Sequence, residues 1–254
     1  MQRVLDLDLD AFIYGKEHSR GRDQPRLDPD EFPPWDSKKL DDFLSAQCLL
    51  DGPLPGLAVD HHAEVFHAWR DGIEAGILKP KFEVTHIDAH SDLAFIDTGR
   101  SYLKRKVLAS PLEARRHPNE GVDALGDGNY LAFAIANRWI SSIEYVIGGR
   151  PEWECVDDEP PYKWQPGDLI FEDFEGRTPF SHVIRLAPAG NPPSAEPEPP
   201  VAFDWYRYQQ FQARASYDFI FLAHSRPYTP ESADELYERI AQRFIGDWPV
   251  GPHG

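Results

Sequence analysis

The sequence predicts an α/β fold, a three-layer sandwich in which helices cover a mainly parallel β-sheet. Two observations lead to this prediction. Short apolar runs typical of strands alternate along the chain with longer segments of helical periodicity. The chain also has 254 residues, of which 41% are hydrophobic, which is enough to build a sizeable core. One domain spanning residues 1–254 is expected, because single α/β cores commonly reach this length.

The first predicted strand, residues 3–13 (RVLDLDLDAFI), alternates apolar residues with aspartates. Residues 15–35 are polar and contain several prolines, so they predict a long loop. A helix is expected at 37–50 and a strand at 54–62. The later elements are predicted as helices at 63–78, 129–140 and 229–244 and as strands at 81–92, 142–149 and 215–225.

Two later segments are less regular. Residues 150–188 are expected to supply one or two more strands, with boundaries that the pattern leaves open. Residues 187–201 (APAGNPPSAEPEPPV) are Pro-rich and cannot hold regular structure, so they predict a loop. Strands separated by helices of these lengths indicate βαβ units, and sites in such sheets form outside the carboxyl ends of the strands.

Charge and cysteine content restrict the function classes. The net charge of −17 disfavours nucleic acid and anionic membranes as partners and favours cations, either metal ions or basic substrates, although acidic surfaces also confer solubility. Neither a membrane span nor a signal peptide is predicted. Cys48 and Cys155 are too few for a disulfide framework and wrongly spaced for a structural zinc site. A cytoplasmic protein is expected, and a homo-oligomer is left open.

Three acidic and histidine-rich motifs follow predicted strands: DLDLD at 6–10, VDHH at 59–62 and HIDAHSD at 86–92. All three are expected at one edge of the sheet. In an extended backbone, side chains two positions apart point the same way, as Asp88, His90 and Asp92 would. Carboxylates and histidines without cysteine suit Mn²⁺ and related ions, and a pair of such ions can lower the pKa of a bridging water toward ~7. The motifs therefore predict a two-metal hydrolytic site.

Other interpretations apply to single residues. HIDAHSD is otherwise a loop with capping Asp and Ser, but carboxylates gathered without a partner would repel one another, which favours metal binding. Either His61 or His62 can be a ligand. His86 is expected to pack inside its strand or to support a ligand, and Asp6 to form a supporting hydrogen bond. His224, at the end of its strand, either faces the site or has a structural role.

The motifs are similar to those of the arginase (ureohydrolase) family. DAHSD resembles its Asp-Ala-His-x-Asp signature, DLDLD its Asp-x-Asp strand and VDHH its Asp-His element. The longer strings LDLDAFI, VDHHAEVFHAW, HIDAHSDL and DFIFLAHSRPYTP resemble the peptide arginase branch, whose members trim arginine side chains in ribosomally made peptides. The resemblance covers about a quarter of the chain. It implies an arginase/deacetylase-like fold, circularly permuted, because the family's Asp-x-Asp strand comes late whereas here it opens the chain.

The resemblance also implies a metal site and a reaction. It favours His61 over His62, because His61 directly follows Asp60. Asp88 and one aspartate of the Asp8/Asp10 pair would bridge two Mn²⁺ ions. Hydroxide would attack the guanidinium carbon of an arginine in a precursor peptide and give ornithine and urea, with catalysis carried by Asp88, Asp92 and Glu64. The implied metal ligands are Asp8, Asp10, His61, Asp88, His90 and Asp92.

The sequence departs from the small-molecule enzymes of the family. Their Asn two residues after the signature is replaced here by Ala94, which weakens free arginine as the substrate and is compatible with a peptide. Their proton-shuttling His has no clear match in LAFIDTGRSYLKRKV, residues 93–107. Their guanidinium-binding Glu also lacks a match near FLAHSRPYTP. Glu64 is the substitute that we expect, and His224 is a second candidate for contact with the substrate.

Three other functions are compatible with parts of the pattern. One is a small-molecule ureohydrolase of the agmatinase or formiminoglutamase kind. Another is a Mg²⁺-dependent haloacid-dehalogenase-like phosphatase, because DLDLDAFI resembles its first motif, although this function leaves DAHSD unexplained. The last is a non-catalytic relative that binds a peptide. The presence of all six ligand types argues against a decayed site.

Overall fold

The structure is a computed structural model that describes residues 1–17, 20–21, 23–93, 97–121, 123–148, 169–173, 181–186 and 198–250. Its centre is a β-sheet of nine strands in the order β5-β6-β7-β4-β3-β1-β8-β2-β9. From β7 to β9 every neighbouring pair is parallel, whereas β6 pairs antiparallel with both β7 and β5. The predicted α/β class with a mainly parallel sheet is thus confirmed.

The strands agree with most of the predicted strand segments, with shorter boundaries. The two strands in the segment 150–188 lie within the range in which strands were expected. The unpredicted ones are β7, which begins at the last residue of the Pro-rich segment, and the short edge strand β9. The strands are β1 (Arg3–Asp8), β2 (Leu54–Val59), β3 (Phe82–Asp88), β4 (Ile140–Ile147), β5 (Leu169–Asp173), β6 (Ser181–Leu186), β7 (Val201–Arg207), β8 (Phe219–Ala223) and β9 (Ile245–Gly246). Residues 187–197 of the predicted loop lie outside the described residues.

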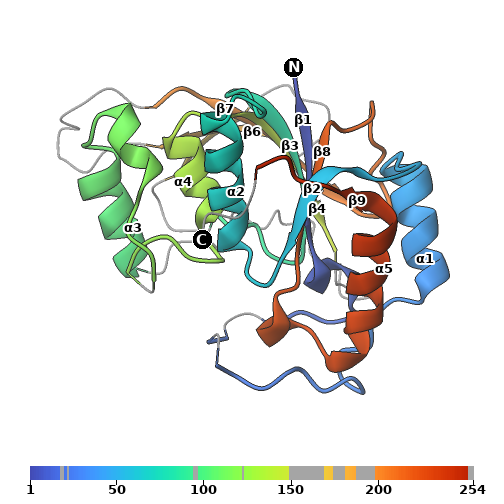
Figure 1. Cartoon of the computed structure of the whole chain (residues 1–254). Coiled ribbons are helices and arrows are strands. Elements are labelled where there is room, and N and C mark those ends of the chain that lie inside the picture. The colour runs from blue at the N-terminus through green and yellow to red at the C-terminus, as the bar shows by residue number, and fades with distance from the viewer. Residues whose placement is uncertain are drawn as a thin grey trace.

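Helices lie on both sides of the sheet (Figure 1). One side carries α2 (Ala63–Glu74), α3 (Asp97–Tyr102) and α4 (Tyr130–Ala136), and the other carries α1 (Ser37–Asp42) and α5 (Asp234–Phe244). The predicted helix at 37–50 is split, because α1 passes into a wider π-type turn at Phe43–Gln47. Short α3 was not predicted.

Each face of the sheet has its own apolar cluster. Val4 of β1 packs with Trp69 of α2 and Phe133 of α4, whereas Leu5 and Leu7 pack with the residues of α1 and α5 on the other face. β1 is buried along its whole length, as expected of a strand in the middle of the sheet. Its aspartates therefore lie inside the protein, where unpaired carboxylates are costly.

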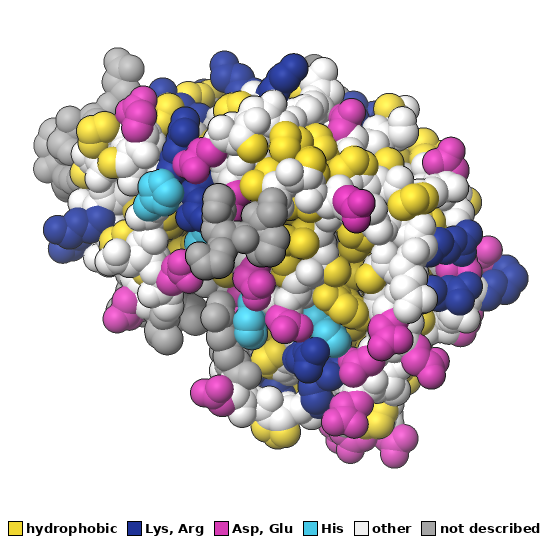
Figure 2. Space-filling model, in the orientation of Figure 1, with side chains coloured by type: hydrophobic (Ala, Val, Ile, Leu, Met, Phe, Trp, Pro, Cys, Tyr) yellow, Lys and Arg dark blue, Asp and Glu magenta, His cyan; other side chains and the backbone are white. Residues whose placement is uncertain are grey.

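The carboxyl ends of the parallel strands meet at one edge of the sheet, at the bottom of Figure 1. The described residues of the segment 13–36 and the segment from His224 to Ala233 both run across this edge. They contact each other through a bridge between Leu27 and Pro230 and a hydrogen bond from the Arg20 backbone N–H to Tyr228 Oη. Acidic side chains gather around this edge and the start of α5 in the space-filling view (Figure 2). Within the described residues, we find no helix with the length and apolar content needed to span a membrane.

Candidate metal centre

The centre is built at the ends of two neighbouring strands. β1 and β3 run side by side with Asp6 opposite His86, and the strands end at Asp8 and Asp88. At both ends the chain then turns in the same way. The backbone N–H of Asp10 donates to Asp8 Oδ1 at 3.0 Å, and the backbone N–H of His90 donates to Asp88 Oδ1 at 2.6 Å. These turns, rather than a continued extended backbone, bring Asp10 and His90 back toward the strand ends.

One group of side chains surrounds His62. Its Nδ1 atom lies 3.0 Å from Asp8 Oδ2, 3.2 Å from Asp88 Oδ2 and 2.9 Å from Asp92 Oδ2. All four side chains are buried. We call Asp8, His62, Asp88 and Asp92 the His62 sub-site. It places one imidazole nitrogen and three carboxylates around one point, a donor set suited to a divalent ion.

A second group surrounds His90. Its Nδ1 atom lies 2.8 Å from Asp10 Oδ2 and 3.6 Å from Asp88 Oδ1. We call Asp10, Asp88 and His90 the His90 sub-site. Asp88 belongs to both sub-sites, and it faces His62 with Oδ2 and His90 with Oδ1. One side chain thus contributes a carboxylate oxygen to each of the two sub-sites.

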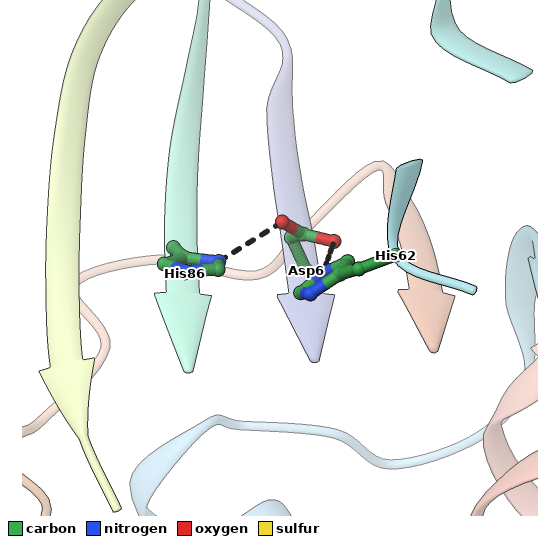
Figure 3. Close-up of side chains that lie close together, drawn as sticks. All are labelled: Asp6, His62 and His86. Carbon is green, nitrogen blue, oxygen red and sulfur yellow. Dashed lines mark hydrogen bonds and ion pairs between the residues drawn. The ribbon is translucent and has the colours of Figure 1, made fainter. Parts of the chain in front are cut away.

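The other ring nitrogen of each histidine points away from the sub-sites. His90 Nε2 lies 2.7 Å from the carbonyl oxygen of Glu17. His62 Nε2 lies 3.2 Å from Asp6 Oδ1, and Asp6 also contacts His86 Nδ1 at 3.1 Å (Figure 3). The hydroxyl of Tyr130 donates to the same carboxylate. Asp8 is held in turn by the Ser225 hydroxyl, which donates to Asp8 Oδ2 at 2.5 Å.

Carboxylates packed together in the interior have shifted pKa values. Burial, with the charges of Asp8 and Asp88, raises the pKa of Asp10 well above its usual range. Burial, with the charge of Asp88, raises the pKa of Asp92 to about 7. Burial opposes ionisation of Asp88 as well, but its interactions with His62 and His90 outweigh that effect and lower its pKa. A bound cation would reduce the electrostatic repulsion among these buried carboxylates.

The donor set could hold divalent metal ions. His62 Nδ1 and Asp88 Oδ2 are buried and make no hydrogen bond within the described residues, although each is close to a group of opposite character. Such unsatisfied buried atoms are rare in folded proteins and call for a partner such as an ion. Among the described residues no thiolate contributes, because Cys48 is buried in the apolar cluster on the α1 and α5 face. Oxygen and imidazole donors suit Mn²⁺ better than a thiolate-type zinc site.

Of the two adjacent histidines, His62 lies in this centre, whereas His61, which the resemblance favoured as the ligand, lies outside it. The His61 side chain is 31% exposed, and its Nδ1 atom lies 3.6 Å from Asp127 Oδ2, outside both sub-sites. The side chain of Asp127 also accepts a hydrogen bond from the backbone N–H of Ala63 at 3.0 Å and so fixes the start of α2. This start turns His62 toward the strand ends and His61 away from them. The other five predicted ligands, Asp8, Asp10, Asp88, His90 and Asp92, lie together.

The two residues expected to contact the substrate have other neighbours. Exposed Glu64 accepts a hydrogen bond from the backbone N–H of His61 at 3.0 Å, which caps the first turn of α2. His224 is buried against the ring of Tyr237, at 4.2 Å between centroids, and its Nε2 atom lies 2.8 Å from Asp234 Oδ1. No contact of either residue with the two sub-sites is found among the described residues.

Two residues of the centre were missed by the sequence reasoning. Ser225 follows β8 at the same edge of the sheet, so the rule that located the aspartates would also have located it. Tyr130 lies in the first turn of α4, in an otherwise apolar segment, and nothing near it in the sequence indicates a contact with Asp6.

Comparison with known proteins does not identify a family. No model of a protein family matches the chain, and no curated protein matches it.

Proposed function

We propose that the protein is a manganese-dependent hydrolase that converts arginine residues of a ribosomally made precursor peptide to ornithine and releases urea. The observation that carries this proposal is the position of Asp88, whose two oxygens face the Nδ1 atoms of two different histidines. A carboxylate shared in this way supports a two-ion site rather than a single ion. The motifs DLDLD, VDHH and DAHSD, which resemble those of the arginase family, meet in this one centre.

In this proposal, different side chains would bind each of two ions. Asp8, His62 and Asp92 would hold one, Asp10 and His90 the other, and Asp88 would contact both. When bound, a pair of ions of this kind lowers the pKa of water toward neutrality and so supplies the nucleophile for hydrolysis. Ser225 fixes the carboxylate of Asp8, and the Glu17 carbonyl fixes the ring of His90. The side chains are thus oriented before substrate arrives, which avoids reorganisation during the reaction.

The proposed reaction balances as a simple hydrolysis. The oxygen of water bonds to the guanidinium carbon, and the bond from this carbon to Nε breaks. Nε takes up both protons of the water and leaves as the ammonium group of ornithine, and the carbon leaves with the water oxygen as neutral urea. Cationic arginine is also the kind of side chain that an acidic surface attracts, and the chain has a net charge of −17.

A peptide is favoured over free arginine because Ala94 replaces the Asn of the small-molecule enzymes. Glu64 and His224 stay predictions for contact with the substrate. Glu64 caps α2, and His224 bonds to Asp234. To contact the substrate, each residue would either keep this partner and bind the substrate as well, or release the partner in favour of the substrate.

The proposal is tested by mass spectrometry of arginine-containing peptides incubated with the protein and Mn²⁺. Each hydrolysed arginine lowers the peptide mass by about 42 Da, the difference that guanidinium hydrolysis to an amine produces. Free arginine is run in parallel with urea as the readout. Asp88→Asn, which removes the shared carboxylate with almost no change in volume, is the matched control and should show no conversion.

The possible results separate the candidate functions. Conversion of peptide but not of free arginine supports the proposal, and conversion of free arginine or agmatine alone would indicate a small-molecule ureohydrolase. Bound Mn²⁺ without any conversion across a diverse peptide library would argue for a binding protein. Release of phosphate from a phosphate ester in the presence of Mg²⁺ would favour the phosphatase.

A further inference from the structure

Next to the His62 sub-site lies a buried group of four side chains in contact: Asp6, His62, His86 and Tyr130. Among the described residues, its one carboxylate, that of Asp6, contacts no other carboxylate of the centre. Asp6 lies in the middle of β1, two residues before Asp8, and is fully buried. Its side chain points between His86 on β3 and His62 at the start of α2 (Figure 3). Three hydrogen-bonding side chains surround it and supply the partners that a carboxylate in the core needs.

The contacts of Asp6 are divided between its two oxygens. Oδ2 accepts from Tyr130 Oη and from His86 Nδ1, which lies at 3.1 Å. Among the described residues, Oδ1 faces His62 Nε2 alone, at 3.2 Å. A carboxylate can only accept, so the proton between Oδ1 and Nε2 must be on the histidine.

The alternative tautomer of His62 also has a partner in the structure. Tyr130 Oη lies 3.0 Å from His62 Nε2, close enough to donate to it if that nitrogen carried a lone pair. In that case Nδ1 would carry the proton and could not bind a cation. In its neutral form, which is the form that binds a metal ion, His62 therefore has two possible hydrogen-bonding states, and the negative charge of Asp6 selects between them.

We propose that Asp6 is a positioning residue that holds His62 in its Nε2–H tautomer and thereby presents the Nδ1 lone pair to a divalent ion in the His62 sub-site. Tyr130 and His86 keep the Asp6 carboxylate in place by binding its other oxygen. This inference rests on the proposed function, because it requires that the His62 sub-site bind a metal ion. Carboxylate partners of this kind commonly strengthen metal binding by 10–100-fold.

Asp6→Asn is the sharpest test, because it keeps the volume and reverses the hydrogen bonding at one atom. The amide oxygen is drawn to the side where Tyr130 and His86 donate, which leaves the amide NH₂ facing His62 Nε2. The NH₂ group donates to Nε2, the proton moves to Nδ1, and the sub-site loses its imidazole ligand. The His90 sub-site does not contain His62 and should be spared.

The readout is the binding of Mn²⁺ alone, measured by electron paramagnetic resonance of the free ion during titration and independent of hydrolysis. We expect two ions per chain in the unmodified protein. Asp6→Asn should bind one ion with unchanged affinity and the second about 10–100-fold more weakly. Tyr130→Phe removes the competing donor, and His86 still binds Asp6 Oδ2, so this variant should still bind two ions. Thermal unfolding of each metal-free variant shows whether its fold is intact.

Several results would overturn the inference. Two sites of unchanged affinity in Asp6→Asn would show that the carboxylate does not select the tautomer. Loss of both ions, or an equal loss in Tyr130→Phe, would show that the buried group acts through packing alone. If the unmodified protein binds no Mn²⁺, the proposed function fails first, and this inference fails with it.

A measurement on the unmodified protein covers the case in which Asp6→Asn does not fold. Histidine side-chain ¹⁵N spectra of the protein loaded with diamagnetic Zn²⁺ report the tautomer directly, and comparison with His62→Asn identifies the His62 signals. A proton on Nε2 is the expected result. A proton on Nδ1 in the loaded protein would overturn the inference without any variant at position 6.

Discussion

His62 Nδ1 lies 3.2 Å from Asp88 Oδ2 in the interior, and neither atom makes a hydrogen bond within the described part of the chain. A buried polar atom left unsatisfied costs about 1–3 kcal/mol. Both atoms face the same point, so one cation would satisfy both. We therefore expect metal binding to recover free energy that the metal-free protein loses at these two atoms. This effect can be measured without a substrate.

The neighbouring histidines provide a matched pair of variants. His62→Asn removes the imidazole at the centre of the His62 sub-site, and we expect the affinity for one of two Mn²⁺ ions to fall by at least about 100-fold. His61→Asn changes a partly exposed ring whose partner is Asp127, and both ions should bind as before. Isothermal titration with Mn²⁺ measures both affinities. The reverse pattern would return the ligand role to His61.

Metal and pH together should control stability. The pKa of Asp92 is raised to about 7 by burial and Asp88, and burial with neighbouring carboxylates also raises the pKa of Asp10. A carboxyl whose folded pKa exceeds its unfolded value loses stability as pH rises toward the folded pKa. The histidine pKa values are raised despite burial, at His62 mainly by Tyr130 and Asp6 and at His90 by Asp10, so their contribution also declines above their unfolded pKa. The metal-free protein should therefore be less stable at pH 8 than at pH 6.

Addition of Mn²⁺ should reverse this trend, because metal ligands bind in their deprotonated forms. At a free concentration of about 100 Kd, one site adds about 2.7 kcal/mol, or a rise in Tm of roughly 5–10 °C for a chain of this size. Thermal unfolding at pH 6 and at pH 8, each with Mn²⁺ and with EDTA, gives the four Tm values to be compared. A larger Mn²⁺ effect at pH 6 than at pH 8 would contradict the prediction. The low pKa values of Asp6 and Asp88 act only at acidic pH, outside this range.

The position of the centre could be predicted because it depends on strand ends. Apolar runs fix where β1 and β3 lie, and the carboxyl edge of a parallel sheet gathers whatever follows. This is why Asp8, Asp88 and their neighbours were located from sequence alone. The rule says nothing about side-chain orientation beyond a strand end, where turns at Asp8 and Asp88 replaced the expected extended backbone.

The contacts that were not predicted come from distant parts of the chain. Tyr130 binds Asp6 across 124 positions, and the choice between His61 and His62 depends on Asp127, which lies 64 positions after Ala63. Local patterns carry no information on such pairs. β7 was missed for a different reason, because the Pro-rich segment obscured the apolar residues that follow it from Val201.

Variants of Ser225 should show how much the hydrogen bond from its hydroxyl to Asp8 contributes to stability. Its hydroxyl donates to Asp8, and its backbone has a φ of 48°, in the left-handed region. Ser225→Ala loses a hydrogen bond to a carboxylate, at a cost of about 1.5–3 kcal/mol, and keeps the strained backbone. Ser225→Gly loses the same bond but relieves about 1 kcal/mol of strain. In urea unfolding, the Gly variant should therefore have a higher free energy of unfolding than the Ala variant. Equal stabilities would mean that strain at this position is negligible.

Arg26 should hold the described residues of the segment 13–36 over the carboxyl edge of the sheet. Its guanidinium donates to the carbonyls of Thr229 and Pro230, each at 2.8 Å, and pairs with Asp234 at 2.5 Å. Removal of these charge-assisted bonds in Arg26→Ala should lower the local opening free energy by about 2 kcal/mol. Hydrogen exchange of the described loop residues should become faster, whereas Mn²⁺ affinity should not change, because Arg26 touches neither sub-site.

Arg239 offers the matched control for this loop prediction. It also pairs with an aspartate, Asp41, but on the outer surface between α5 and α1. Exposed pairs of this kind contribute about 0–1 kcal/mol, so Arg239→Ala should leave exchange in residues 13–36 unchanged. If both variants accelerate exchange equally, the loop responds to general destabilisation and not to the loss of its anchor. If only Arg26→Ala does, the anchor controls how readily the loop over the metal centre opens, and a bulky peptide substrate should be converted faster by that variant.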